Sequence, residues 1–499
     1  MKHLSKKLTS VITAVLAVVM ALTLAPTAYA ADSTYKLTLT GTATGHTYEA
    51  YQIITGDLST KEDGTKALSN AKWGEGVTYT GTESAADVAK ALGDGTMTIA
   101  QLEEKLTLTK PAKTVTSAKD STVIEGLDAG YYLVKDKDGT QANTSDAYTK
   151  FIVQVVGDTE AKIKSDVPTV VKKVKDTNES TGDTTDWQDS ADYKIGADVP
   201  YQITGTMPSN IADYTSYKYV FTDTMSKGLT YTAKNAKIKI GDTDVTSSFK
   251  EDVTTKDGST VVTWTCDNLK GIEGVTIDAN TKVVVTYSAK LNKDAVIGAA
   301  GNPNTVNLTY SNNPNKGGEG ETGKTPDDKN IVFTYKTVVN KVDQDKKTPL
   351  KGAAFKLEKK VKKDDGTTEY TTVKEFTAGE ETSFEFKGLD DGDYKITETT
   401  TPAGYNTISP IEFTISAEHD AYSADPKLTS LSGKVTTGEA TFTVEKDAGS
   451  LTTDVVNKKG STLPSTGGMG TTVLYVAGAA IVVAAGVGLA IRRNKRRDA

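Results

Sequence analysis

Apolar and polar residues alternate over much of the chain, and this alternation predicts β-strands. In residues 35–40, Tyr35, Leu37 and Leu39 share one face and polar residues occupy the other. Comparable runs recur at residues 47–54, 126–134, 151–156, 169–174, 199–206, 217–223, 229–233, 261–266, 281–291, 304–310, 338–343, 383–386, 394–398, 411–415, 440–444 and 451–457. Short strands separated by turn signals every eight to twelve residues or so are typical of β-sandwiches.

A few segments depart from the strand pattern. Residues 84–92 place small and apolar side chains on one helical face, and residues 99–106 offer a second short helix. The stretches 176–192 and 311–330 are polar and contain no apolar periodicity. We therefore expect a loop at residues 176–192 and a long exposed loop or linker at residues 311–330.

The strands group into units that set the domain organisation. We expect a mainly β protein with three tandem Ig-like β-sandwich domains, at residues 31–165, 166–333 and 334–460. Protein domains typically have about 150 residues, and this division into three units agrees with that size. Residues 1–30 and 461–499 lie outside the sandwiches.

Both ends of the chain carry membrane-directed segments. Residues 1–30 have a positive start, an apolar stretch and an Ala-Tyr-Ala cleavage site, which together predict a secretory signal peptide. Residues 472–491 are apolar and long enough, at ~1.5 Å per residue, to cross a hydrocarbon core of about 30 Å as a helix. The arginine-rich residues 492–497 favour the cytoplasmic side, so the domains are expected outside the cell.

The composition argues against several classes of partner and site. A net charge of −7 argues against a nucleic-acid partner. The one cysteine, Cys266, cannot form a disulfide within the chain and reads as a buried small residue. The only histidines are His3, His46 and His419, and they do not cluster with other ligands, so we expect no metal, no cofactor and no enzyme.

A pentapeptide precedes the apolar C-terminal run: Leu463, Pro464, Ser465, Thr466 and Gly467. With the membrane segment and basic tail that follow, it resembles the LPxTG cell-wall sorting signal of Gram-positive surface proteins. The resemblance implies that a sortase cuts between Thr466 and Gly467 and joins the Thr466 carbonyl to an amine. The alternative is a plain single-pass anchor with a chance LPSTG.

The third unit carries a longer motif at residues 394–405, which read YKITETTTPAGY. They resemble the E-box of sortase-assembled pilins, and the flanking strands resemble the first and last strands of a CnaB-type sandwich. The resemblance implies an isopeptide bond between Lys341 and Asn457, assisted by Glu398. The alternative is an ordinary buried ion pair between Lys341 and Glu398.

The chemistry of such a bond depends on burial. A lysine at its ordinary pKa of about 10.4 is protonated and cannot attack, and burial lowers that pKa. The neutral amine attacks the Asn amide carbon and expels ammonia. Holding the groups in contact supplies effective molarities of about 10⁵ M or more. Because the reaction occurs once per molecule, the chain is not an enzyme.

The middle unit resembles the CnaA-like second domain of pilins, on residues 167–174, 221–229 and 304–310. The resemblance implies a bond between Lys172 and Asn304, assisted by Asp223.

Neighbouring residues are rivals for these roles, because a strand shifted by one residue swaps its faces. Lys173 is the rival of Lys172, and Asn312 is the rival of Asn304. Val170 and Val174 share a face with Lys172, which favours Lys172 as the inward lysine. The alternative is that these charges are solvated on a strand.

The first unit shows only part of the E-box pattern, at residues 131–136. Lys135 stands where the Glu should be, so we expect no isopeptide bond there. Backbone pilins join subunits through a lysine between their first two domains. The matching place here offers Lys164, with Lys162 as the alternative, although the Tyr-Pro pair of the family motif is missing.

The leading hypothesis is the structural shaft subunit of a covalent pilus on the cell wall. Its expected partners are a pilin sortase and a housekeeping sortase, identical subunits in the filament, minor pilins, peptidoglycan and possible host surface ligands. The alternative is a monomeric wall-anchored adhesin, or a minor or tip pilin, that binds host ligands through its loops.

Overall fold

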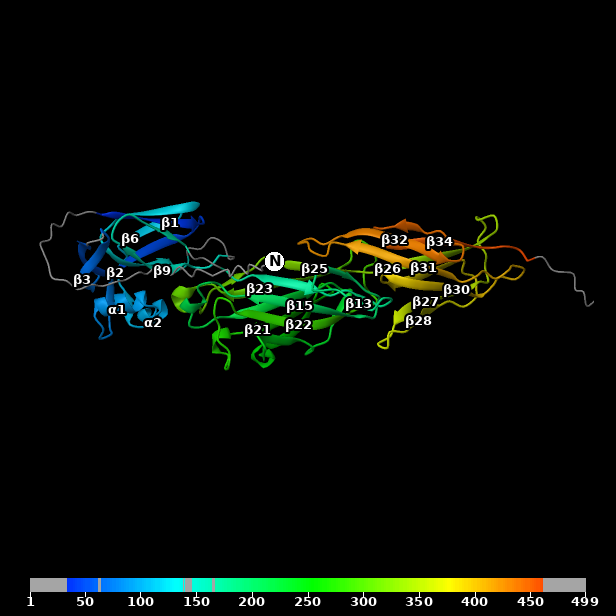
Figure 1. The fold of residues 1–499 in the computed structure, drawn as a ribbon, viewed down its shortest axis with the longest axis horizontal. Helices are drawn as coiled ribbons and strands as arrows, with labels where there is room; N and C mark the ends of the chain where they lie inside the picture. The colour runs from blue at the N-terminus through cyan, green and yellow to red at the C-terminus, as the bar shows by residue number, and fades with distance from the viewer. Residues whose placement is uncertain (1–33, 62–63, 138, 140–145, 164–166, 461–499) are drawn as a thin grey trace, which may run out of the picture.

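The computed structural model describes residues 34–61, 64–137, 139, 146–163 and 167–460. It is a mainly β structure, with three sandwich domains in a row along the long axis (Figure 1). The expected fold class is confirmed for the described residues. The predicted signal peptide, sorting pentapeptide and apolar C-terminal run lie outside them.

The first domain combines a small sheet, a larger sheet and two short helices. Its strands are β1 (Tyr35–Thr42), β2 (Thr47–Thr60), β3 (Lys66–Trp73), β4 (Val77–Tyr79), β5 (Leu106–Leu108), β6 (Lys113–Thr116), β7 (Asp120–Leu127), β8 (Gly130–Asp136), β9 (Lys150–Val155) and β10 (Thr159–Lys162). The sheets run in the orders β10-β1-β7 and β3-β2-β8-β9. Both predicted helices are present, as α1 (Ala85–Gly93) and α2 (Ile99–Glu103), and Ser84 caps α1 by accepting a hydrogen bond from Asp87 N.

The middle domain packs two large sheets against each other. Its strands are β11 (Val170–Val174), β12 (Thr177–Asn178), β13 (Asp183–Thr184), β14 (Ser190–Asp192), β15 (Asp198–Thr206), β16 (Tyr219–Met225), β17 (Leu229–Tyr231), β18 (Lys237–Ile240), β19 (Thr243–Asp244), β20 (Lys250–Lys256), β21 (Ser259–Cys266), β22 (Lys282–Leu291), β23 (Asn302–Ser311), β24 (Thr322–Lys324) and β25 (Asp328–Phe333). One sheet has the order β11-β15-β22-β18-β19 and the other β14-β25-β23-β16-β21-β20.

The third domain is a smaller sandwich of the same kind. Its strands are β26 (Tyr335–Asp343), β27 (Ala354–Lys362), β28 (Thr368–Glu375), β29 (Ser383–Leu389), β30 (Gly392–Thr400), β31 (Ile411–His419), β32 (Leu428–Thr437), β33 (Thr443–Glu445) and β34 (Ser450–Asn457). The sheets have the orders β29-β26-β34-β33 and β28-β27-β30-β31-β32. The first strand, β26, therefore lies beside the last strand, β34, and the two are parallel.

The junction between the middle and third domains is built into a shared strand. β25 pairs within the middle-domain sheet, yet its residues alternate between two cores. Val332 packs in the middle-domain core, whereas Ile331 and Phe333 pack in the third-domain core. Because successive strand residues point to opposite faces, one strand serves both domains.

The expectation of a plain loop at residues 176–192 is wrong. This stretch contains β12, β13 and β14, and it contacts the third domain. The Ser180 hydroxyl donates to Lys360 O at 2.8 Å and accepts from Asp393 N at 2.9 Å. Asp192 Oδ1 accepts from Asp391 N at 2.9 Å. The polar groups are satisfied across the domain boundary, so this segment needs no apolar periodicity of its own.

Residues 311–330 are likewise not an exposed linker. They include β24 and the first half of β25, and Asn312 and Asn313 are buried. Asn312 O accepts from Tyr148 N at 2.8 Å, and Lys150 Nζ donates to Pro314 O at 2.7 Å. Both partners belong to the first domain. This polar stretch is therefore part of the contact between the first and middle domains.

Candidate functional site

The third domain brings its predicted lysine and asparagine together on neighbouring strands. Lys341 on β26 and Asn457 at the end of β34 are both fully buried. Lys341 stands opposite Val455 in the parallel register, and Asp343 stands opposite Asn457. Residues two apart share a face of a strand, so the Lys341 and Asn457 side chains point to the same side of the sheet.

The contacts in this site are close. Lys341 Nζ lies 2.5 Å from Asn457 Oδ1 and 2.9 Å from Val455 O. Asn457 Nδ2 donates a hydrogen bond of 3.0 Å to Glu398 Oε1, which is 3.8 Å from Lys341 Nζ. One carboxylate oxygen therefore contacts the amide nitrogen and lies close to the amine. This arrangement can pass a proton from the lysine to the amide nitrogen.

The E-box motif positions the acid from the opposite sheet. Glu398 lies on β30, and its second oxygen accepts hydrogen bonds from Thr401 Oγ1 at 3.2 Å and Ile408 N at 3.1 Å. Both donors follow β30 in the chain. The turn that carries the Thr-Pro-Ala-Gly-Tyr sequence thus fixes the orientation of the carboxylate.

Burial changes the acidity of the amine. Desolvation lowers the pKa of Lys341 to about 8, against the opposing effect of the Glu398 carboxylate, which favours the ammonium form. A larger fraction of the amine is therefore neutral near physiological pH than for an exposed lysine.

The middle domain forms a second buried cluster. Lys172 on β11 and Asp223 on β16 are fully buried, with Lys172 Nζ 2.9 Å from Asp223 Oδ2. Burial lowers the pKa of Lys172 and raises the pKa of Asp223, so each group shifts toward its neutral form. Asn304 on β23 is also fully buried.

Sequence reasoning missed a tyrosine in this cluster. The Tyr287 hydroxyl accepts from Lys172 Nζ at 2.6 Å and from Asn304 Nδ2 at 2.9 Å, and it donates to Asp223 Oδ2. Tyr287 lies on β22, where an aromatic residue in an alternating run is read as core. It stands directly opposite Tyr201 of β15, and a pair of core tyrosines gives no sign of a chemical role.

The rival residues lie elsewhere. Lys173 points away from the cluster and pairs with Asp189 at 2.5 Å. Asn312 donates to Asp146 O at 3.2 Å, at the contact with the first domain. A further asparagine was not foreseen: Asn330 on β25 is fully buried opposite Asn304, and its amide has no hydrogen-bond partner among the described residues.

The first domain has no comparable lysine and asparagine pair among the residues described. Lys36 on β1 is exposed and pairs with Glu125 at 2.9 Å. Lys135 is half-buried, and the next residue, Asp136, is the buried acid. Asp136 contacts His46 Nδ1 at 2.9 Å, so His46 is the buried partner of this acid.

The predicted intersubunit and sorting residues are mostly beyond the described ranges. Lys162 is exposed at the end of β10, opposite Thr40. Lys164 and the pentapeptide Leu463–Gly467, including Ser465 and Thr466, lie outside the described residues. Within the described part of the chain, no helix has the length and apolarity needed to span a membrane.

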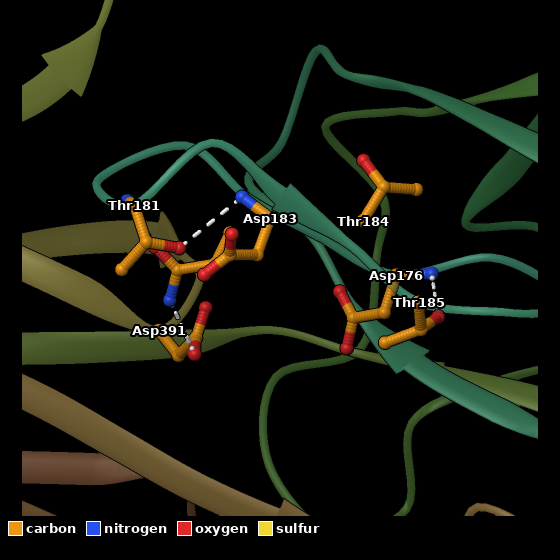
Figure 2. A pocket seen from close by; sticks show the side chains of 7 residues that line it. Asp176, Thr181, Asp183, Thr184, Thr185 and Asp391 are labelled. Atoms are coloured by element: carbon orange, nitrogen blue, oxygen red, sulfur yellow. Dashed lines mark hydrogen bonds between the residues drawn. The ribbon is translucent and has the colours of Figure 1, made fainter. Parts of the chain in front are cut away.

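An acidic cluster marks the contact between the middle and third domains. Asp176, Asp183 and Asp391 line a pocket of about 370 Å³ beside the β12–β13 hairpin (Figure 2). Nearby, ligand-type atoms of Asp176, Asp192 and His419 lie within 4.8 Å of one another, so these side chains could admit a cation. The Asp192 oxygens already accept hydrogen bonds from Asp391 N and from the Tyr335 hydroxyl at 3.3 Å, and burial raises the pKa of Asp192.

Comparison with protein families adds matches in the middle domain, in the third domain and at the C-terminal anchor. The model of the Gram-positive pilin backbone subunit 2, Cna-B-like domain matches residues 195–314, and the SpaA prealbumin-like fold domain matches residues 336–427. The LPXTG cell wall anchor motif matches residues 455–497. The middle domain is thus described as Cna-B-like, whereas the sequence resemblance was to a CnaA-like domain.

Full-length relatives agree with these matches. The chain is 26% identical to the trypsin-resistant surface T6 protein of Streptococcus pyogenes serotype M6, over 94% of this chain and 96% of that protein. The structure of the T6 backbone pilin of the same serotype has a TM-score of 0.52 at 19% identity, covering 87% of this chain and 100% of the other.

The tandem sandwiches and the anchor motif define a cell-wall-anchored surface protein of the Gram-positive type. Together with the T6 relative, they identify this chain as a sortase-assembled backbone pilin. It is a structural protein of a surface pilus.

Proposed function

We propose that this chain is the repeating shaft subunit of a covalent pilus in which two kinds of amide bond carry the load. A Lys341–Asn457 bond and a Lys172–Asn304 bond close the third and middle domains internally. A sortase bond joins Thr466 of one subunit to Lys164, or alternatively Lys162, of the next. The buried contact between Lys341, Asn457 and Glu398 is the observation that carries the proposal.

The geometry of both clusters supports the proposed internal bonds. In the third domain the amine already contacts the amide, and Glu398 contacts the nitrogen that must leave as ammonia. In the middle domain Lys172 and Asn304 share the Tyr287 hydroxyl, beside the buried acid Asp223. Groups held at contact distance avoid most of the entropy cost of a reaction between separate molecules.

The internal bonds also fit what a shaft needs. The chain cannot form a disulfide within itself, because Cys266 is its only cysteine. A crosslink that closes a loop of ~100 residues stabilises a domain by roughly 4–5 kcal/mol in the chain-entropy description. The T6 relative is named a trypsin-resistant protein. We expect trypsin resistance here as well, with the crosslinked domains as its source.

The exposure of Lys162 supports a sortase bond at the linking segment. Lys162 is exposed, as a lysine must be if a separate enzyme is to reach it. Joining the C-terminal end of one subunit to a lysine near residue 164 of the next uses two different surfaces. Such a heterologous contact gives an open filament rather than a closed ring.

Peptide mapping of the three-domain chain (residues 31–460) tests the internal bonds. Tryptic digestion of the denatured chain should yield branched peptides that join Lys341 to Asn457 and Lys172 to Asn304. Asn304→Ala should remove the second branched peptide, and Asn330→Ala should leave it intact. A branched peptide that survives Asn304→Ala but not Asn330→Ala would contradict the assignment of Asn304.

A further inference from the structure

The Tyr287 hydroxyl occupies the centre of the middle-domain cluster. It contacts the amine of Lys172 at 2.6 Å and the amide nitrogen of Asn304 at 2.9 Å, and it donates to Asp223 Oδ2. The Tyr287 hydroxyl therefore makes hydrogen bonds to the attacking nitrogen, to the departing nitrogen and to the acid.

In the third domain, the acid itself lies close to both nitrogens, without a tyrosine between them. There one oxygen of Glu398 is 3.0 Å from the amide nitrogen of Asn457 and 3.8 Å from the amine of Lys341. In the middle domain the acid is an aspartate, one methylene shorter. Among the described residues, no hydrogen bond joins Asp223 to Asn304, and Asp223 Oδ1 has no partner. The tyrosine hydroxyl fills the gap that the shorter acid leaves.

We propose that Tyr287 is a further catalytic residue of the middle domain, where its hydroxyl relays a proton from Asp223 to the departing nitrogen of Asn304. This inference rests on the proposed Lys172–Asn304 bond. It adds the hydroxyl that connects the shorter acid, Asp223, to the departing nitrogen.

The proton transfers balance as follows. The lone pair of neutral Lys172 Nζ attacks Cγ of Asn304 and forms the new carbon–nitrogen bond. The Tyr287 hydroxyl gives its proton to Nδ2 and takes one from the carboxyl of Asp223. The bond from Cγ to Nδ2 breaks, and ammonia leaves. Asp223 regains a proton from Nζ, 2.9 Å away, so both Tyr287 and Asp223 end unchanged.

Refolding of the three-domain chain from denaturant, followed by intact mass, tests the relay. Each crosslink removes one ammonia, and peptide mapping assigns each loss to its domain. With Tyr287→Phe we expect the third-domain loss at the wild-type rate. The middle-domain loss should slow by about a hundredfold, the usual scale for general acid–base catalysis. Crosslinking of the middle domain at the wild-type rate in this variant would overturn the proposal.

Tyr217 supplies a matched control. It is fully buried in the middle-domain core, its ring packs edge-to-face on Tyr214 with centroids 4.9 Å apart, and its hydroxyl has no hydrogen-bond partner among the residues described. Tyr217→Phe removes a buried hydroxyl from the same core, and this hydroxyl makes no hydrogen bond to the relay residues. Both crosslinks should then form at wild-type rates, and a middle-domain defect as large as that of Tyr287→Phe would contradict a specific role for Tyr287.

A second substitution keeps the hydroxyl of residue 287. Placing 3,5-difluorotyrosine at position 287 makes the phenol more acidic while preserving its size. The pH profile of middle-domain crosslinking should then shift to lower pH, with the third-domain profile unchanged. An unshifted profile would reduce Tyr287 to a packing role. If the wild-type middle domain never loses ammonia, the Lys172–Asn304 bond itself fails, which is a different result from normal crosslinking in Tyr287→Phe.

Discussion

Lys341 Nζ lies 2.5 Å from Oδ1 of Asn457, although the two residues are 116 positions apart in the chain. They sit on the first and last strands of the third domain, which are adjacent and parallel. A bond between them would close a loop around nearly the whole domain. Pulling on either end of such a domain loads the crosslink rather than the hydrogen bonds of the sheet.

Glu398→Ala should abolish the third-domain crosslink. The variant loses the group that contacts the departing nitrogen, so the chain should retain one ammonia more than the wild type by intact mass. The third domain should also lose roughly 4–5 kcal/mol of unfolding free energy, because its unfolded chain is no longer constrained. Thermal unfolding and trypsin digestion measure this loss.

Glu380→Ala is the control for this substitution, since Glu380 is an exposed acid paired with Lys351 on the surface. Its mass and stability should match the wild type. A Glu398→Ala chain that still lacks the same ammonia would remove Glu398 from the mechanism.

Third-domain crosslinking should slow above about pH 8. The reaction needs a neutral Lys341 and a proton on Glu398, so the pair must hold one proton between them. With the pKa of Lys341 lowered to about 8, that proton is lost as pH rises further. Refolding at pH 6 to 10 with timed intact-mass sampling should give a rate that is level up to about pH 8. Above it, the rate should fall about tenfold per unit.

Glu398→Gln reverses the expected sign. Without the carboxyl, only the neutral amine is needed, so the slow residual reaction should rise with pH. A wild-type rate that climbs through pH 8 would mean that the proton of the pair plays no part.

The alternation of residues predicted much of this structure. Val170 and Val174 share a face of β11 with Lys172, and all three side chains are buried. Lys173 faces the other side, because successive residues of a strand point to opposite faces. The E-box resemblance pointed to Glu398, and in the structure this carboxylate accepts a hydrogen bond from Asn457 Nδ2. The first prediction rests on the pattern of buried apolar side chains and the second on the resemblance of a motif.

The sequence could not reveal contacts made by polar groups across domain boundaries. Residues 176–192 and 311–330 lack apolar periodicity because hydrogen bonds to the neighbouring domain, such as that between Ser180 and Asp393, stabilise them where they are buried. Tyr287 was hidden for a related reason. A tyrosine in an alternating strand looks the same in the sequence whether or not its hydroxyl stands at the centre of a polar cluster.

The first domain should weaken as pH rises. Its buried His46 contacts Asp136, and this hydrogen bond raises the pKa of His46. A raised pKa means that the stabilisation is fully present below about pH 6.5 and is lost as pH rises through the folded-state value. The thermal unfolding midpoint of the first domain should therefore fall between pH 6 and pH 9.

His46→Gln should flatten this dependence and lower stability by about 3 kcal/mol, since it leaves Asp136 buried without a cationic partner. A first-domain midpoint that is constant or rises over this pH range in the wild type would contradict the role given to the pair.

Loss of the linking lysine should abolish polymerisation. Cells that express the chain with its pilin sortase should show a ladder of covalent high-mass species on denaturing gels. Lys164→Ala should collapse the ladder to one species; if Lys162 is the link, Lys162→Ala should do so instead. A ladder that persists when both lysines are replaced would exclude this segment, and a wild type without any ladder would favour the adhesin alternative.

Intact mass of the wild-type three-domain chain, residues 31–460, tests the central claim most directly. Self-formed bonds at Lys341–Asn457 and Lys172–Asn304 predict a mass lower than that calculated from the sequence by two molecules of ammonia. A mass equal to the calculated value would mean that both buried lysines remain free amines, and the covalent account of this shaft would be wrong.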